Sequence, residues 1–191
     1  MQFDFFNDAP DLPPITLEAH ALRDYGPRTG VNARAADTTV AFATDFTTHG
    51  ERLTKKVAGS TYVDIPFGSD VQSAADRLIR FMKARGAVKL NVAGNGIYTL
   101  KLSKVSQALA NQWVYEVLKQ VHAAVRLVNI RSGGQTGVDE AGLVAGLALG
   151  VPVIGLYPAG FRQRLESGVD VDADPAELLA RITACAAALN K

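Results

Sequence analysis

The residues best suited to chemistry form a glycine-rich turn, RSGGQTGVDE, at positions 131–140. Its glycines allow backbone N–H groups to approach a ligand closely. The polar residues between them add hydroxyl and amide donors, and a helix that begins near Gly137 adds unpaired N–H groups and the positive end of its dipole. We therefore predict that the turn binds a phosphate or another oxyanion, the alternative being a tight turn whose glycines serve packing only. The candidate binding residues are Ser132, Gly133, Gly134, Gln135, Thr136 and Gly137.

A second loop, AGNGIYT at positions 93–99, also combines glycines with groups that bind ligands. Gly94 and Gly96 permit close approach of the backbone, and Asn95 between them offers a side-chain amide. Tyr98 offers a ring that could stack on a base or a pterin. The alternative is an ordinary Asn-Gly turn with Tyr98 packed in the core.

A third loop, DFTTHGE at positions 45–51, brings carboxylates. Thr47 and Thr48 offer hydroxyls, while Glu51 or Asp45 could act as a general acid or base or bind ribose hydroxyls. Thr48 and Glu51 also have the spacing of a helix capping box, which by itself accounts for both residues. Asp139, just after the glycine-rich turn, is the third candidate catalytic carboxylate, although acids early in a helix also stabilise its dipole.

Other reactive side chains give no further site. The three histidines, His20, His49 and His122, are scattered and lack metal-ligand spacing, so no metal site is predicted. Cys185 falls on the apolar stripe of the last predicted helix and is expected in the core.

Composition limits the class of protein. The chain has 191 residues, of which 48% are hydrophobic and 20% charged, with a formal net charge of +1. These values predict one globular domain and argue against a generally basic nucleic-acid binder. No apolar run reaches the length of a membrane span, and acidic residues stand near the start where a signal peptide needs basic ones. We expect a cytoplasmic protein with no nucleic-acid or membrane partner.

The elements that must position the three loops alternate between strands and helices. Short β-branched runs predict strands at 39–44, 61–65, 88–93, 127–131 and 152–156. Apolar periodicity predicts helices at 69–86, with Ser69 and Gln72 as a capping box, and at 104–124, 137–149 and after Asp174. Short helices are expected near 16–24 and 29–36, and residues 157–173 form a long connection of a kind often found as a lid.

This alternation predicts an α/β fold with a mostly parallel, doubly wound sheet of five strands and helices on both faces. In such sheets ligands bind beyond the C-terminal ends of the strands, where strand order reverses. The three loops all follow predicted strands.

Three segments resemble the molybdenum cofactor carrier family, a Rossmann-like group. The segment at 130–161, IRSGGQTGVDEAGLVAGLALGVPVIGLYPAGF, resembles the opening of that family, with its Ser-Gly-Gly-Gln-Thr-Gly-x-Asp loop. KLNVAG followed by GIY resembles its closing strand, and RTGVNARAADTTVAFATDFTTHGERLTKKVAG at 28–59 resembles its middle. The order differs from the family's, so the chain resembles a circular permutant in which a helix at 104–125 joins the old ends. The likeness covers about residues 25–165.

A weaker similarity links the chain to the Lonely Guy phosphoribohydrolases, which cleave the base from a nucleoside monophosphate. Their Pro-Gly-Gly-x-Gly-Thr-x-x-Glu loop would fall on residues 45–51, where the glycine pair is missing. The resemblance implies a spatial strand order of 2-1-3-4-5 in a three-layer Rossmann-like domain at 25–191, preceded by an extension at 1–24. It also implies that loops 45–51 and 94–99 face each other across the switch point, with 132–137 beside them.

These observations together predict a carrier-like domain that binds a phosphorylated heterocycle, either a nucleotide or a molybdopterin-type cofactor. One alternative is a nucleotide N-glycosidase in which Glu51, Asp45 or Asp139 stabilises an oxocarbenium-like transition state. Another is an interaction module with a vestigial cleft. Since related architectures commonly associate, a homo-oligomer is also expected.

Overall fold

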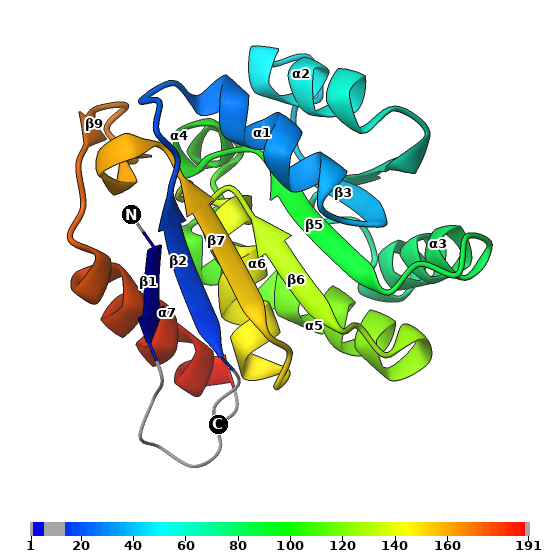
Figure 1. The fold of residues 1–191 in the computed structure, drawn as a ribbon. Coiled ribbons are helices and arrows are strands. Elements are labelled where there is room, and N and C mark those ends of the chain that lie inside the picture. The colour runs from blue at the N-terminus through cyan, green and yellow to red at the C-terminus, as the bar shows by residue number, and fades with distance from the viewer. Residues whose placement is uncertain (1, 6–13, 190–191) are drawn as a thin grey trace.

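One seven-stranded sheet with helices on both faces forms the centre of the molecule (Figure 1). The computed structural model describes residues 2–5 and 14–189. The strands of the sheet are β1 (Gln2–Phe5), β2 (Ile15–Ala19), β3 (Thr38–Ala43), β4 (Tyr62–Pro66), β5 (Lys89–Gly94), β6 (Asn129–Ser132) and β7 (Val153–Tyr157). The helices are α1 (Tyr25–Arg34), α2 (His49–Ala58), α3 (Val71–Lys83), α4 (Ile97–Leu100), α5 (Gln107–Val125), α6 (Val138–Ala148) and α7 (Pro175–Leu189). Short 3-10 turns lie at Gly59–Thr61, Lys101–Ser103 and Ala159–Phe161.

The sheet order is β1-β2-β7-β6-β5-β3-β4. The five strands predicted from the sequence are β3 to β7, and they are parallel to their neighbours in the predicted spatial order 2-1-3-4-5. The three-layer, doubly wound α/β architecture is therefore confirmed.

The prediction of only five strands is wrong, because residues 1–24 contribute two more. β2 adds to β7 in parallel, and β1 pairs with β2 in the antiparallel direction. The helix expected near 16–24 is in part this strand β2, in which Ile15 and Leu17 are buried at the period of two that a strand requires. The run is only five residues long and contains a glutamate, so its alternation is weak in the sequence.

The helices form two layers, one on each face of the sheet. α1 and α2 pack together on one face, and α3, α5, α6 and α7 cover the other (Figure 1). α6 is the predicted buried helix, since every residue from Val138 to Leu147 is buried. It approaches the sheet closely because Gly142 and Gly146 face Val92 and Val153, where a Cβ would come within 2.7 and 2.4 Å of those side chains.

Several helix ends differ from the sequence prediction. α3 is capped by Asp70, whose Oδ2 accepts a hydrogen bond of 2.8 Å from Ser73 N–H, so the predicted Ser69–Gln72 capping box is wrong. Asp and Ser are comparable N-cap residues, and the helix begins at Val71, which makes Asp70 the capping residue. The predicted cap of α7 is confirmed, because Asp174 Oδ1 accepts from the N–H groups of Ala176 and Glu177 at 2.7 and 3.2 Å. Cys185 is partly buried against the core.

The long connection at 157–173 contains a small hairpin. β8 (Gln163–Arg164) and β9 (Asp170–Val171) pair in the antiparallel direction and form a two-stranded sheet of their own. Within residues 2–5 and 14–189, no helix combines the length and apolar character needed to cross a membrane.

Candidate functional site

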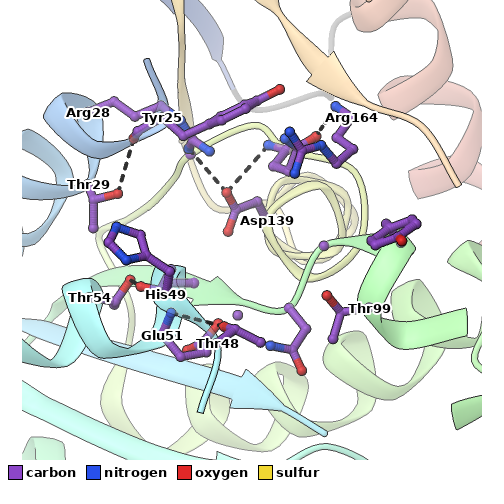
Figure 2. Close-up of a pocket in the computed structure, with 18 of the residues that line it drawn as sticks. Tyr25, Arg28, Thr29, Thr48, His49, Glu51, Thr54, Thr99, Asp139 and Arg164 are labelled. Carbon is purple, nitrogen blue, oxygen red and sulfur yellow. Dashed lines mark hydrogen bonds and ion pairs between the residues drawn. The ribbon is translucent and has the colours of Figure 1, made fainter. Parts of the chain in front are cut away.

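A cavity of about 380 Å³ lies at the C-terminal ends of β3, β5 and β6. This is the region where the strand order reverses, as ligand sites in doubly wound sheets require. Residues from five parts of the chain line it (Figure 2). α1 contributes Tyr25, Arg28, Thr29 and Asn32, the start of α2 contributes Thr48, His49, Gly50, Glu51 and Thr54, and the hairpin contributes Arg164. β5 and its loop contribute Asn91, Ala93, Gly94, Asn95, Gly96, Ile97, Tyr98 and Thr99, and the glycine-rich turn and α6 contribute Gly133, Gln135 and Asp139.

The cavity brings together members of all three predicted loops. The predicted residues that line it are Thr48, Glu51, Gly94, Asn95, Gly96, Tyr98, Gly133, Gln135 and Asp139. The predicted residues outside its lining are Asp45, Thr47, Ser132, Gly134, Thr136 and Gly137. Asp45 and Thr47 instead bind each other, since Asp45 Oδ1 accepts from the N–H and hydroxyl of Thr47 at 2.7 and 2.6 Å, which lowers the pKa of the aspartate.

Much of the glycine-rich turn is hydrogen-bonded within the protein. The N–H of Thr136 donates to Gln135 Oε1 at 3.0 Å, and that of Gly137 donates to Gln107 Oε1 at 2.6 Å. The next N–H, of Val138, donates to the carbonyl of Asn95 at 3.1 Å. A ligand in the cavity therefore meets mainly the side chains around this turn, not these three backbone donors.

Two glycines of the turn make room for side chains behind them. A Cβ on Gly133 would lie 1.4 Å from Arg28 Nη1 and 2.3 Å from Asp139 Oδ2. A Cβ on Gly134, which has a φ of +68°, would lie 2.4 Å from the ring of Tyr157. Packing thus explains these two glycines, and the packing at Gly133 creates the buried ion pair between Arg28 and Asp139.

Asn95 is the residue that fixes the cavity wall. Its Oδ1 accepts from the N–H groups of Thr44 and Asp45, both at 2.9 Å. Its Nδ2 donates to the carbonyl of Asp45 at 3.0 Å and to Glu51 Oε1 at 3.4 Å. Together with its carbonyl bond to Val138, this buried amide connects the ends of β3 and β5, α2 and α6.

Glu51 is a buried carboxyl group that faces the cavity. The expected cap is half confirmed, because Thr48 Oγ1 accepts from Glu51 N–H at 3.3 Å, whereas the Glu51 carboxyl turns to Asn95. Burial, with smaller contributions from the carboxylates of Asp139 and Asp45, raises the pKa of Glu51 to about 8, against the opposing hydrogen bond from Asn95. Its Oε2 is buried and has no hydrogen-bond partner among the described residues.

Asp139 is the second buried carboxyl group of the cavity. Arg28 Nη1 lies 3.2 Å from Asp139 Oδ2, and Gln135 N–H donates to the same oxygen at 3.4 Å. Burial raises the pKa of Asp139, and the guanidinium of Arg28 and the Gln135 N–H oppose that rise. The cavity therefore holds two carboxyls whose proton affinities are both increased.

Residue types alone did not point to the α1 face of the cavity. Tyr25, Arg28, Thr29 and Asn32 follow the helical spacing i, i+3, i+4, i+7, but as a polar stripe. Such spacing was available in the sequence as a signal, because a polar stripe on a helix that packs against a sheet implies a polar cavity between them. Arg164 from the hairpin, Thr54 from α2 and Asn91 from β5 are further polar lining residues that sequence reasoning missed.

Two arginines lie close to the ring of Tyr25 in the lining of the cavity (Figure 2). The guanidinium carbon of Arg28 lies 5.5 Å from the ring centroid, and that of Arg164 lies 5.7 Å from it. The hydroxyl of Tyr25 donates to Asp170 Oδ1 at 2.9 Å.

The part of the chain that the structure describes contains no group of three or more His, Cys, Asp or Glu residues able to hold a metal ion.

Comparison with known protein families agrees with this architecture. Residues 130–172 match the circularly permutated YpsA SLOG family. The matched segment contains most of β6 together with α6, β7 and the hairpin, and so includes Gly133, Asp139 and Arg164. No curated protein sequence matches the chain. The match supports the circular permutation inferred from the order of segments, whereas a likeness specific to molybdenum cofactor carriers stays a prediction.

Proposed function

We propose that the cavity binds a phosphorylated heterocyclic small molecule of the nucleotide type. The observation that carries the proposal is the lining itself, which joins uncharged hydrogen-bonding groups, tyrosine rings and arginines at the switch point of the sheet. The match to a circularly permutated SLOG family over 130–172 supports a nucleotide-related ligand.

The inner part of the cavity suits the ring and sugar of such a ligand. Asn32 and Asn91 are buried there, and Thr29 and Thr54 lie beside them. Amides and hydroxyls of this kind recognise hydroxyl groups and the edges of heterocycles without requiring charge. Tyr98, which is 45% exposed at the rim, offers a ring face for stacking.

A molybdopterin-type cofactor shares this chemistry, because it also combines a planar heterocycle with a phosphate. The residues present fit its organic part as they fit a nucleotide, and Tyr98 and the amide side chains would contact the pterin ring. We rank it second, since the family match carries no molybdenum specificity.

A cavity-blocking variant tests the proposal. Gly50 lines the cavity, and a Cβ on it would meet nothing within 4 Å. Gly50→Trp should therefore fill the mouth without disturbing the core. Lys56→Trp, on an exposed position of the same helix, is the matched control.

The measurement is thermal stabilisation by nucleoside 5′-monophosphates and by pterin phosphates. A ligand at 100 times its dissociation constant adds about 2.7 kcal/mol to the free energy of unfolding. We expect this stabilisation in the unmodified protein and in Lys56→Trp but not in Gly50→Trp. Equal binding by Gly50→Trp would place the ligand elsewhere, and no stabilisation by any compound would refute the proposed function.

Hydrolysis of an N-glycosidic bond is a second candidate function, favoured by the two carboxyls Glu51 and Asp139 in one cavity. In that reaction the bond between C1′ and the base nitrogen breaks, and protonated Glu51 supplies the proton that the base takes. The hydroxyl of a water then adds to C1′, and the other proton of that water returns to the Glu51 carboxylate. Asp139 would stabilise the positive charge that develops on the sugar. Glu51→Gln separates the cases, since an enzyme would keep ligand binding and lose release of the free base.

A further inference from the structure

We propose that Arg164 selects ligands that carry a phosphate. Its guanidinium releases Asp170 and binds that phosphate at the mouth of the cavity. The uncharged part of the ligand then occupies the floor. This inference rests on the proposed function and assigns an orientation to its ligand.

The floor of the cavity, formed by the buried residues Arg28, Glu51 and Asp139, is poorly suited to bind an anion. Its cation, Arg28, is already matched by Asp139 at 3.2 Å, and their side chains are only 7% and 10% exposed. A second carboxyl, Glu51, is buried in the same lining. A phosphate placed beside the Asp139 carboxylate would meet repulsion and would compete for a guanidinium that is already paired. The uncharged ring and sugar suit this region better.

Arg164 is the cation at the mouth that can change partners. Its side chain is 46% exposed and forms a two-point contact with Asp170, with Nε 2.8 Å from Oδ1 and Nη2 3.0 Å from Oδ2. The planar guanidinium binds a phosphate with the same two-point geometry that it uses for a carboxylate. Because Arg164 also lines the cavity, a bound phosphate can replace Asp170 as its partner.

The exchange would leave Asp170 well supported. Arg162 Nη2 lies 2.8 Å from Asp170 Oδ2, and the hydroxyl of Tyr25 donates to Oδ1 at 2.9 Å. When Arg164 turns away, the carboxylate therefore keeps two of its three side-chain partners. An aspartate held in this way can release one arginine at low cost, since it is not left buried and unpaired.

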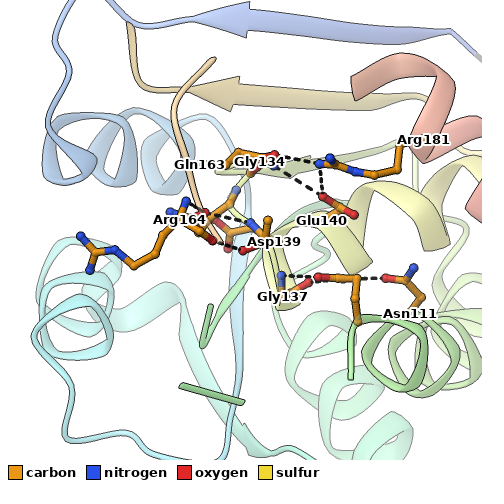
Figure 3. Close-up of polar contacts among 11 residues, drawn as sticks. Asn111, Gly134, Gly137, Asp139, Glu140, Gln163, Arg164 and Arg181 are labelled. Carbon is orange, nitrogen blue, oxygen red and sulfur yellow. Dashed lines mark hydrogen bonds and ion pairs between the residues drawn. The ribbon is translucent and has the colours of Figure 1, made fainter. Parts of the chain in front are cut away.

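The backbone of Arg164 is fixed independently of its side chain (Figure 3). Its N–H donates to Gln135 Oε1 at 2.6 Å, and its carbonyl accepts from the hydroxyl of Thr136. The preceding residue, Gln163, donates to the carbonyl of Gly134 at 2.6 Å. The hairpin thus holds the backbone of Arg164 against the glycine-rich turn. A substitution of the Arg164 side chain leaves these backbone contacts in place.

The experiment compares each nucleoside 5′-monophosphate of adenine, guanine, cytosine and uracil with its nucleoside. Dissociation constants are measured by calorimetry for the unmodified protein, Arg164→Gln, Asp170→Asn and Arg23→Gln. The control residue Arg23 forms a comparable two-point pair with Asp172 at 2.8 and 3.0 Å but does not line the cavity.

We expect Arg164→Gln to weaken binding of the monophosphate about tenfold or more and to leave binding of the nucleoside unchanged. Asp170→Asn removes the competing charge and should strengthen binding of the monophosphate, and Arg23→Gln should preserve the preference for phosphate. A preference that survives in Arg164→Gln would overturn the assignment and point to Arg28. An unmodified protein that binds neither compound would refute the proposed function itself.

Discussion

The guanidinium of Arg28 meets the carboxylate of Asp139 at the position that a side chain on Gly133 would occupy. The two charged residues are separated by 111 positions in the chain, and both are buried. The buried ion pair between Arg28 on α1 and Asp139 on α6 therefore requires a glycine at position 133.

Gly133→Ala should therefore be destabilising. The new Cβ would lie 1.4 Å from Arg28 Nη1, so the ion pair must separate within a buried setting. Loss of one partner of a buried pair costs about 3–5 kcal/mol of unfolding free energy. Urea denaturation measures the change. Gly50→Ala, where a Cβ meets open space, is the control and should be neutral or slightly stabilising. Equal stability of the two variants would contradict the role given to the pair.

The raised pKa of Glu51 makes stability depend on pH. The folded protein holds this proton up to a pH of about 8, whereas the unfolded chain releases it near the ordinary glutamate pKa of 4.5. Between these values the folded state binds more protons than the unfolded one, so the free energy of unfolding falls as pH rises, by up to ~1.4 kcal/mol per pH unit. Above a pH of about 8 the contribution of this group is constant.

Unfolding free energies measured from pH 5 to 9 check this dependence. Glu51→Gln should lose the slope and become more stable than the unmodified protein toward the alkaline end. Glu177→Gln, at an exposed position in the first turn of α7, should retain the slope. If Glu51→Gln shows the same slope as the unmodified protein, the carboxyl is not protonated in the folded state.

Asn95 should be costly to remove. Its amide satisfies the N–H groups of Thr44 and Asp45 and donates to Glu51. Asn95→Ala leaves these groups without partners, at about 1–3 kcal/mol for each one that stays buried. We expect a loss of several kcal/mol in urea denaturation and weaker binding of any ligand. Asn91→Ala, which removes one hydrogen bond of 3.3 Å to Thr39, should cost less.

The ion pair between Arg181 and Glu140 offers a double-mutant test. Arg181 Nη2 lies 2.7 Å from Glu140 Oε2, and the glutamate side chain is only 3% exposed (Figure 3). Arg181→Met should lower the melting temperature, because it leaves a buried carboxylate without its cation. Adding Glu140→Gln should restore much of the loss, since the neutral amide has no charge to compensate. Additive losses in the double variant would show that the two residues do not interact.

The central architecture could be predicted because each of the strands β3 to β7 overlaps a short run with β-branched or apolar residues and is followed by a turn or a helix. Alternation of these elements implies the parallel sheet, and family resemblance supplied the strand order. β2 was missed because its alternation spans only five residues and three of its five side chains are polar or small. A strand at this end of the sheet needs only one buried row, which short sequence windows show poorly.

The candidate site was predictable as three loops but not as a set of contacts. Thr48 and Glu51 have a sufficient local explanation as a helix cap, and nothing nearby in sequence shows that the Glu51 carboxyl is buried against Asn95. Arg28 and Arg164 come from elements that the search for apolar stripes and glycine turns does not examine. Such residues become visible only when the fold brings distant segments together.

The position of β2 beside β7 bears on how this protein can be shortened. Removing residues 1–20 would take away the strand that pairs with the full length of β7 along one edge and would expose the core against which Leu17 packs. The bared strand would then be a template for pairing with other molecules. Expression trials should keep the first 20 residues. If a shortened protein were insoluble, the cause would be the loss of β2 from the sheet and not a change in the cavity.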